Sequence, residues 1–192
     1  MLGAIRSFFA VELSNELKQA VDALQRMLDS PRYNVRWVQP GNVHLTLRFL
    51  GEITEEELEA ASGAAARAAA KGAPFRISLR GLGAFPSPGS PRIVWAGIEQ
   101  CDPLRQLEGD LTRELREARF PPPDKPFSPH LTLGRVKRPP GKEDLRRQLQ
   151  RHQELVLGQQ EVQEFSLIRS DLRSAGPVYE ALTRFTLGSA PP

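Results

Sequence analysis

The chain has 192 residues, 40% of them hydrophobic and 26% charged, with a formal net charge of +3 at pH 7. This length supports one hydrophobic core, divided into two lobes at most, and is too short for two large domains. The chain contains no run of 18 apolar residues, which excludes a membrane-spanning helix. The small positive charge fits either an arginine-rich surface or attraction to a polyanion such as RNA.

The first residues and the cysteine content predict a cytoplasmic protein. Segment 1–12 lacks the long apolar run and the small-residue cleavage site of a signal peptide, and its apolar residues fit a first strand. Cys101 is the single cysteine. It therefore has no partner for an intramolecular disulfide, and a reducing compartment suits the chain.

Hydrophobic periodicity predicts alternating strands and helices in the first part of the chain. Thr54 is the expected N-cap of an alanine-rich helix, because three acidic residues follow it directly and favour the positive end of the helix dipole. The expected elements are strand 5–13, helix 14–28, strand 35–38, strand 43–50 and helix 54–71.

In the second part, segment 83–92 is rich in Gly, Pro and Ser and predicts a loop between two strands. The proline-rich run Pro121–Pro129 predicts a stiff connector. The expected elements are strand 75–79, strand 93–98, helix 103–118, strand 130–136, helix 142–152, strand 162–168 and strand 179–185.

This order of elements predicts an α+β fold with two mostly antiparallel sheets that face a central cleft, and with helices packed outside. We expect residues 1–192 to form a single domain with two pseudo-symmetric lobes, because one tetrapeptide occurs once in each half of the chain.

That tetrapeptide is His-Leu-Thr-Leu, at His44–Leu47 and again at His130–Leu133. The chain has only three histidines, and two of them lie in these identical motifs. Side chains alternate along a strand, so each motif predicts a strand with its two leucines in the core and its histidine and threonine on the other face. Two such strands can build one active site from both halves of the chain.

Paired His and Thr side chains suit cleavage of a phosphodiester. Imidazole titrates near neutrality, so one ring can remove a proton from water while the other donates a proton to the departing alkoxide. A threonine hydroxyl beside each ring can donate a hydrogen bond to a non-bridging phosphate oxygen. This chemistry requires no metal, and the scattered histidines and single cysteine offer no metal-ligand spacing.

The two motifs and their flanks resemble those of the two-histidine (2H) phosphoesterase superfamily, and more narrowly its RNA 2′,3′-cyclic phosphodiesterases, also called 2′-5′ RNA ligases. The resemblance runs from residue 5 to about residue 187. It rests on Ile5–Glu12 (IRSFFAVE), Val43–Gly51 (VHLTLRFLG) and Phe127–Val136 (FSPHLTLGRV).

The resemblance implies His44 as the proton donor and His130 as the proton acceptor, with Thr46 and Thr132 holding the phosphate. It implies Arg135 near the substrate, although strict alternation would put Arg135 on the leucine face unless the strand ends or twists at the preceding residue. It further implies opening of a 2′,3′-cyclic phosphate at an RNA 3′ end, which leaves a 2′-phosphate and a free 3′-hydroxyl. The reverse reaction would join a 5′-hydroxyl to the cyclic end as a 2′-5′ linkage.

The expected partner is therefore RNA that ends in a 2′,3′-cyclic phosphate, such as a tRNA fragment, bound by a monomer without cofactor or membrane. Two alternatives stay open: the same chemistry on a small nucleotide, or an RNA-binding module without catalysis. Among further candidates, Trp95 and Phe127 could stack on a base but fit the core as well. His152 lies in a basic segment that fits a solvated helix.

Overall fold

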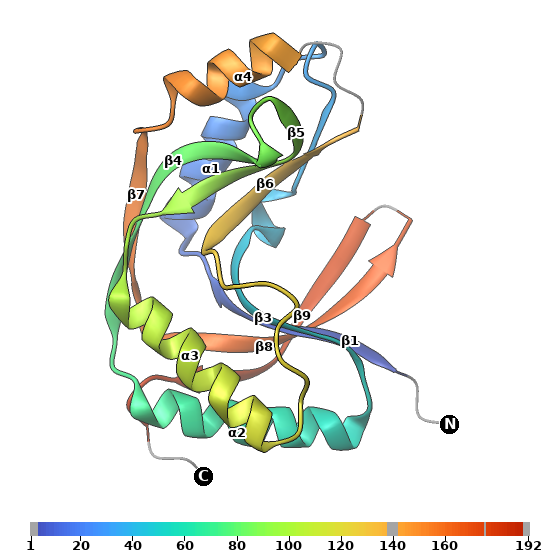
Figure 1. The fold of residues 1–192 in the computed structure, drawn as a ribbon, viewed down its shortest axis with the longest axis vertical. Coiled ribbons are helices and arrows are strands. Elements are labelled where there is room, and N and C mark those ends of the chain that lie inside the picture. The colour runs from blue at the N-terminus through green and yellow to red at the C-terminus, as the bar shows by residue number, and fades with distance from the viewer. Residues whose placement is uncertain (1–3, 138–141, 175, 190–192) are drawn as a thin grey trace.

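A computed structural model describes residues 4–137, 142–174 and 176–189 (Figure 1). Its helices are α1 (Asn15–Leu28), η1 (Pro40–Asn42, a 3₁₀ turn), α2 (Glu55–Lys71), α3 (Asp102–Glu117) and α4 (Lys142–Arg151). Its strands are β1 (Ile5–Glu12), β2 (Val35–Trp37), β3 (His44–Ile53), β4 (Phe75–Ser87), β5 (Ser90–Ile98), β6 (His130–Val136), β7 (Val156–Val162), β8 (Glu164–Arg173) and β9 (Gly176–Thr186). No helix in these ranges is long and apolar enough to cross a membrane.

All described strand pairs are antiparallel and join into one curled sheet with the order β7-β4-β5-β6-β3-β1-β8-β9, while β2 pairs with β6. The two motif strands, β3 and β6, lie next to each other at the centre of this order, with three further strands on each side. The predicted α+β class with mostly antiparallel strands is confirmed, and the two predicted sheets join into one curled sheet through the β3–β6 contact. The pseudo-symmetry of the two lobes stays a prediction.

The helices cover the two halves of the sheet separately. α2 and α3 pack against each other beneath the half that contains β1, β3, β8 and β9, whereas α1 and α4 cover the half that contains β4 to β7 (Figure 1). Thr54 caps α2 as predicted, because its side chain accepts a hydrogen bond from the Glu57 amide while the Glu57 carboxylate accepts one from the Thr54 amide.

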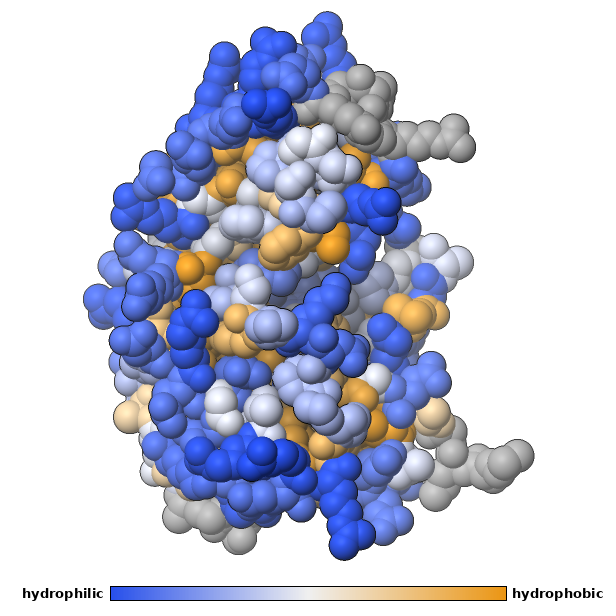
Figure 2. Space-filling view, in the orientation of Figure 1, coloured by the Kyte–Doolittle hydropathy of each residue, from blue (hydrophilic) through white to orange (hydrophobic). Residues whose placement is uncertain are grey.

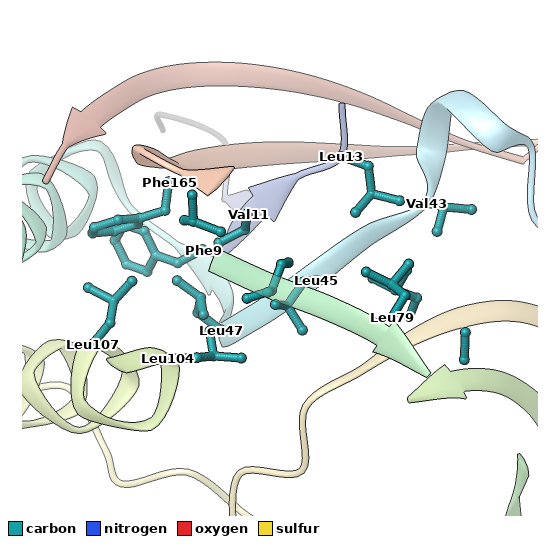
Figure 3. Packing of buried hydrophobic residues seen from close by; sticks show 14 of the residues in the cluster. Phe9, Val11, Leu13, Val43, Leu45, Leu47, Leu79, Leu104, Leu107 and Phe165 are labelled. Carbon is teal, nitrogen blue, oxygen red and sulfur yellow. The ribbon is translucent and has the colours of Figure 1, made fainter. Parts of the chain in front are cut away.

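The main hydrophobic core lies between the sheet and these helices. Leu45 and Leu131 are fully buried in it, as expected for the leucines of the two motifs. Figure 3 shows Leu104 and Leu107 of α3 facing Leu47 and Phe9 of the sheet. The leucine face of each motif strand therefore fixes the strand to the core and leaves the other face for the histidines.

The structure differs from the sequence prediction in two segments. Segment 83–92 is mostly strand, because β4 extends to Ser87 and β5 begins at Ser90, with only a two-residue turn between them. Gly83 is tolerated in the strand since the Trp95 indole fills the space where its side chain would lie. Segment 156–161, which precedes the expected strand 162–168, forms most of edge strand β7; its polar sequence lacks the alternation that marks a half-buried strand.

Gly134 of β6 permits the close approach of β2. A Cβ atom at this position would lie 2.5 Å from Val35 Cγ1 and 2.9 Å from Trp37 Cε3. We expect Gly134→Ala to lower the free energy of unfolding by about 1–3 kcal/mol, the typical cost of overpacking. Urea denaturation measures this change.

Gly109→Ala is the matched control, because a Cβ atom there meets no neighbour within 4 Å and the residue lies inside α3. This variant should be as stable as the wild type or more stable by up to about 1 kcal/mol. Equal stability of the two variants would contradict the assigned packing of β2 on Gly134.

Candidate active site

The two motifs meet at one cross-strand pair. β3 and β6 are antiparallel, and Leu45 pairs with Leu131. Directly paired residues project to the same side of a sheet, and their neighbours along each strand project to the other side. Both histidines and both threonines therefore lie on the face opposite the core, around a single point. We call this side of the sheet the motif face. The space-filling view is hollowed near its centre, between two hydrophilic ends (Figure 2).

Each motif histidine is held in the same way. Nδ1 of His44 lies 2.8 Å from the carbonyl oxygen of Asn42, and Nδ1 of His130 lies 2.7 Å from the carbonyl oxygen of Ser128. A carbonyl oxygen can only accept a hydrogen bond, so Nδ1 must carry the proton in both rings. Nε2 of each ring is left to accept or donate a proton. The backbone two residues before each histidine thus fixes its tautomer and its orientation.

His44 lies in an aromatic environment. Its ring stacks on Phe8 at a centroid distance of 4.7 Å, and Tyr179 meets it edge-on at 5.2 Å. Burial lowers the pKa of the His44 imidazole below its ordinary value, although the bond to the Asn42 carbonyl and the negative charge of Glu12 act in the opposite direction. In the absence of a further negative charge, His44 is therefore biased toward its neutral form.

His130 lies in a more open environment. The edge of Phe85 contacts its ring, with centroids 5.0 Å apart, and its bond to the Ser128 carbonyl is exposed. Thr132, two residues further along β6, pairs with Trp95 of β5, so the indole also lies on the motif face. Trp95, a candidate for base stacking in the sequence, is thus beside the motif rather than in the main core.

Each motif strand has a β-bulge at its last leucine. On β3, Ala10 pairs with Thr46 and the preceding Phe9 pairs with Arg48, which leaves Leu47 without a partner residue in the ladder. On β6, Trp95 pairs with Thr132 and the preceding Val94 pairs with Gly134, which leaves Leu133 without one. A bulge adds one residue to one strand, so alternation restarts after it.

The bulges change which later side chains share the motif face. Arg135 pairs with Ile93, two residues before Trp95 on β5, and therefore lies on the same face as Thr132. Phe49 pairs with Phe8, two residues before Ala10 on β1, and therefore lies on the same face as Thr46. The bulge at Leu133 is the irregularity of β6 that brings Arg135 to the motif face. Strict alternation from His44 gives no indication of this position for Phe49.

Tyr179 of β9 links the two halves of this face. Burial raises the pKa of its phenol, while the positive charges of Arg135 and Arg6 oppose that rise. Arg135 thus lies within electrostatic reach of a ring that contacts His44. The hairpin carrying Tyr179 is tied to the residue before the first motif, because the Asn42 side-chain amide donates to the Pro177 carbonyl at 2.9 Å. No sequence pattern indicates Tyr179, because hairpin pairing alone brings it to His44.

Arg48 and the candidates Phe127 and His152 lie away from the motif face. Arg48 follows the bulge on the core side and is 6% exposed; it donates to the Pro121 carbonyl at the start of the proline-rich connector. Phe127 packs against the main core. His152 follows α4, where its Nδ1 lies 2.8 Å from the Gln148 carbonyl. Within the three described ranges, no cluster of three or more His, Cys, Asp or Glu residues could hold a metal ion.

One known protein family matches this chain over most of its length. The model of the LigT-like phosphoesterase family matches residues 11–95 and 97–179. The chain belongs to this family.

Several relatives match over nearly their full length. An RNA 2′,3′-cyclic phosphodiesterase of Methanothermobacter thermautotrophicus is 36% identical over 95% of this chain and 99% of its own length. The crystal structure of TT0787 of Thermus thermophilus superimposes with a TM-score of 0.80 at 39% identity, over 95% of this chain and 98% of the other. Escherichia coli LigT complexed with 3′-AMP gives a TM-score of 0.76 at 29% identity, over 96% and 98% of the two chains.

The lowered pKa of His44 predicts a loss of stability in acid. Unfolded His44 takes up a proton near its ordinary pKa of 6.5, whereas folded His44 does so only at lower pH. The unfolded chain then binds more protons, so the contribution of His44 to stability is complete above the unfolded pKa and is lost as the pH falls toward the folded pKa. We expect the free energy of unfolding of the wild type to fall more steeply between about pH 7.5 and about pH 5.5 than that of His44→Gln.

Urea denaturation at several pH values measures these slopes. Identical slopes in the wild type and His44→Gln would contradict the pKa direction assigned to His44.

Proposed function

We propose that the protein hydrolyses the 2′,3′-cyclic phosphate at an RNA 3′ end to a 2′-phosphate, by acid–base catalysis with His44 and His130. One observation carries the proposal: two imidazoles flank a single cross-strand pair on one face, and a backbone carbonyl holds the proton of each ring on Nδ1. Both Nε2 atoms are then available for proton transfer. The names of the relatives, RNA 2′,3′-cyclic phosphodiesterases, support the same substrate.

In the proposed reaction, Nε2 of His130 takes a proton from water as the water oxygen attacks phosphorus. The bond between phosphorus and the ribose 3′-oxygen breaks, and Nε2 of His44 gives its proton to that oxygen. The products are a 2′-phosphomonoester and a free 3′-hydroxyl. Each proton transfer typically contributes about 10²–10⁴-fold to the rate.

The different surroundings of the two rings support this division of roles. His44 stacks on Phe8 and contacts Tyr179, so its side of the site is apolar and suits the nucleoside, which retains the leaving oxygen. The exposed bond of His130 suits the side where water enters. The negative charge of the bound phosphate would favour protonated His44, offsetting the effect of burial on its pKa.

We propose that Thr46, Thr132 and Arg135 bind the phosphate. The threonine hydroxyls follow the histidines on the same face, and hydrogen bonds to the phosphoryl oxygens would stabilise the charge that builds up on them. Arg36 pairs with Arg135 across β2 and β6, which adds a second cation to this face. Two arginines in this position favour a substrate with several phosphates over a small nucleotide.

Several finer points of the proposal rest on the sequence. The substrate would be a processed RNA such as a tRNA fragment, acted on in the cytoplasm by a monomer that forms one catalytic domain, with one motif from each lobe. The active site would use neither a metal nor a cofactor. The reverse reaction would use the same proton positions, with a 5′-hydroxyl in the place of water, and would form a 2′-5′ linkage.

Replacing either motif histidine tests the shared site. We expect His44→Ala and His130→Ala each to lower kcat by about 10²–10⁴-fold, because each variant lacks one proton-transfer group. The assay follows hydrolysis of an RNA with a 2′,3′-cyclic phosphate end in the presence of EDTA, and ³¹P NMR locates the phosphate on the product. His152→Ala serves as the matched control and should keep wild-type activity. Full activity in either motif variant, loss of wild-type activity on chelation or a 3′-phosphate product would refute the proposal.

The threonines are tested by isosteric replacement. Thr46→Val and Thr132→Val keep the side-chain shape but lack the hydroxyl, so the fold should be retained. We expect kcat to fall by about 10²–10³-fold in each, as for the loss of one hydrogen-bond donor to a charged transition state. Steady-state kinetics on the same RNA measure the change; a rise in KM with unchanged kcat would instead assign the hydroxyls to ground-state binding.

A further inference from the structure

We propose that Gln25 of α1 is a positioning residue for the phosphate-binding side of the site, an inference that rests on the proposed function. Its side-chain amide would hold the bulge of β6 in place from the core side of the sheet. Arg135 shares the motif face because of this bulge. Gln25 would therefore act on catalysis through Arg135, without touching the substrate.

Gln25 is a buried polar residue whose amide bridges two backbone carbonyls. Its Nε2 donates to the Val38 carbonyl at 2.8 Å and to the Leu133 carbonyl at 2.9 Å. Both partners can only accept, and the amide nitrogen carries two hydrogens, so these two bonds use both of them. Gln25 is only 4% exposed. Its burial is tolerated because the two carbonyls replace the water that the amide nitrogen loses.

The Leu133 carbonyl marks the place where β6 changes its neighbouring strand. Leu131 pairs with β3, whereas Gly134 pairs with β2. Leu133 lies between these two pairs, and it is also the residue that has no partner on β5. Its carbonyl oxygen accepts a second bond, from the Val38 amide at 2.8 Å. Gln25 thus ties the end of β2 to β6 at the residue where regular pairing is interrupted.

The direction of Arg135 depends on the peptide group that Gln25 holds. The Leu133 carbonyl belongs to the peptide bond that leads into Gly134, and Arg135 follows directly. Without the bulge, alternation from Thr132 would turn Arg135 toward the core. Two hydrogen bonds to one oxygen satisfy both of its lone pairs, so this peptide group is held in the orientation that the bulge has.

A glutamine at this position does what an apolar residue could not. Apolar contacts have no preferred direction, whereas a hydrogen bond requires a short distance and a nearly straight angle. Packing of α1 against the sheet would be served equally well by a further apolar side chain. The polar Gln25 interrupts a buried face that is otherwise made of Leu17, Val21, Leu24 and Leu28.

The test is a double-mutant cycle between Gln25→Met and Arg135→Ala on the RNA with a 2′,3′-cyclic phosphate end. Methionine is unbranched and fills the same space, but it donates no hydrogen bond. We expect Gln25→Met to lower kcat/KM by about 10- to 10²-fold, the range for a binding group misplaced by about 1 Å. In the Arg135→Ala background, the same substitution should change kcat/KM by less than about 2-fold, because the group that Gln25 positions is gone.

Val21→Ala is the matched control, because Val21 is a fully buried residue of the same helix whose side chain forms no hydrogen bond. This variant should lower the urea midpoint of unfolding and keep the wild-type kcat/KM, which separates a loss of stability from a loss of positioning. Gln25→Glu is a second variant with the shape of glutamine, and its ionised carboxylate cannot donate. It should reproduce the loss, and either Gln25 variant can complete the cycle.

An unchanged kcat/KM in Gln25→Met, or an equal loss with and without Arg135, would overturn the inference. The same loss in Val21→Ala, or failure of both Gln25 variants to fold, would also overturn it by assigning Gln25 to the stability of the fold. If the wild type does not hydrolyse the RNA, the proposed function fails and the inference falls with it. Wild-type turnover with additive effects of the two substitutions refutes the inference alone.

Discussion

The pairing of Leu45 with Leu131 is the contact on which the site depends. It joins the two halves of the sheet and buries both leucines completely, so the cost of exposing them fixes the relative position of the two motif strands. A slip of one residue in this pairing would place one histidine and one threonine in the core. The relative position of the two histidines is thus fixed from the opposite face of the sheet, by apolar contacts that would take no part in the proposed chemistry.

Much of this arrangement could be predicted from the sequence because it is local. The alternation in each His-Leu-Thr-Leu motif indicates which side chains share a face, and Thr54 followed by acidic residues indicates where α2 begins. The prediction of a loop at 83–92 was wrong for a non-local reason. Gly83 is accommodated in a strand because the indole of Trp95 covers it. Composition alone favours a turn there, and only the pairing of β4 with β5 reverses that preference.

The parts of the site that the sequence did not indicate arise from strand pairing and from bulges. Alternation counted from His130 puts Arg135 on the leucine face, whereas the bulge at Leu133 returns it to the motif face. Phe49 is the same case on β3, and without the bulge it would have been assigned to the core side. Tyr179 reaches His44 through a hairpin that begins far along the chain. None of these positions can be deduced from a strict period of two.

The two copies of the motif are identical in sequence, yet their surroundings make them chemically different. Both rings have the same tautomer, because Nδ1 of each is bonded to a backbone carbonyl. Their aromatic neighbours differ. Phe8 and Tyr179 contact the His44 ring, and burial lowers its pKa. The ring would serve as the proposed acid only with an anion bound beside it. In the proposed reaction, a ring that is biased toward the neutral form in the free protein would acquire its proton when the phosphate binds. The difference between acid and base that the proposed reaction needs would therefore come from neighbouring strands, while the motif itself would supply only the reacting groups.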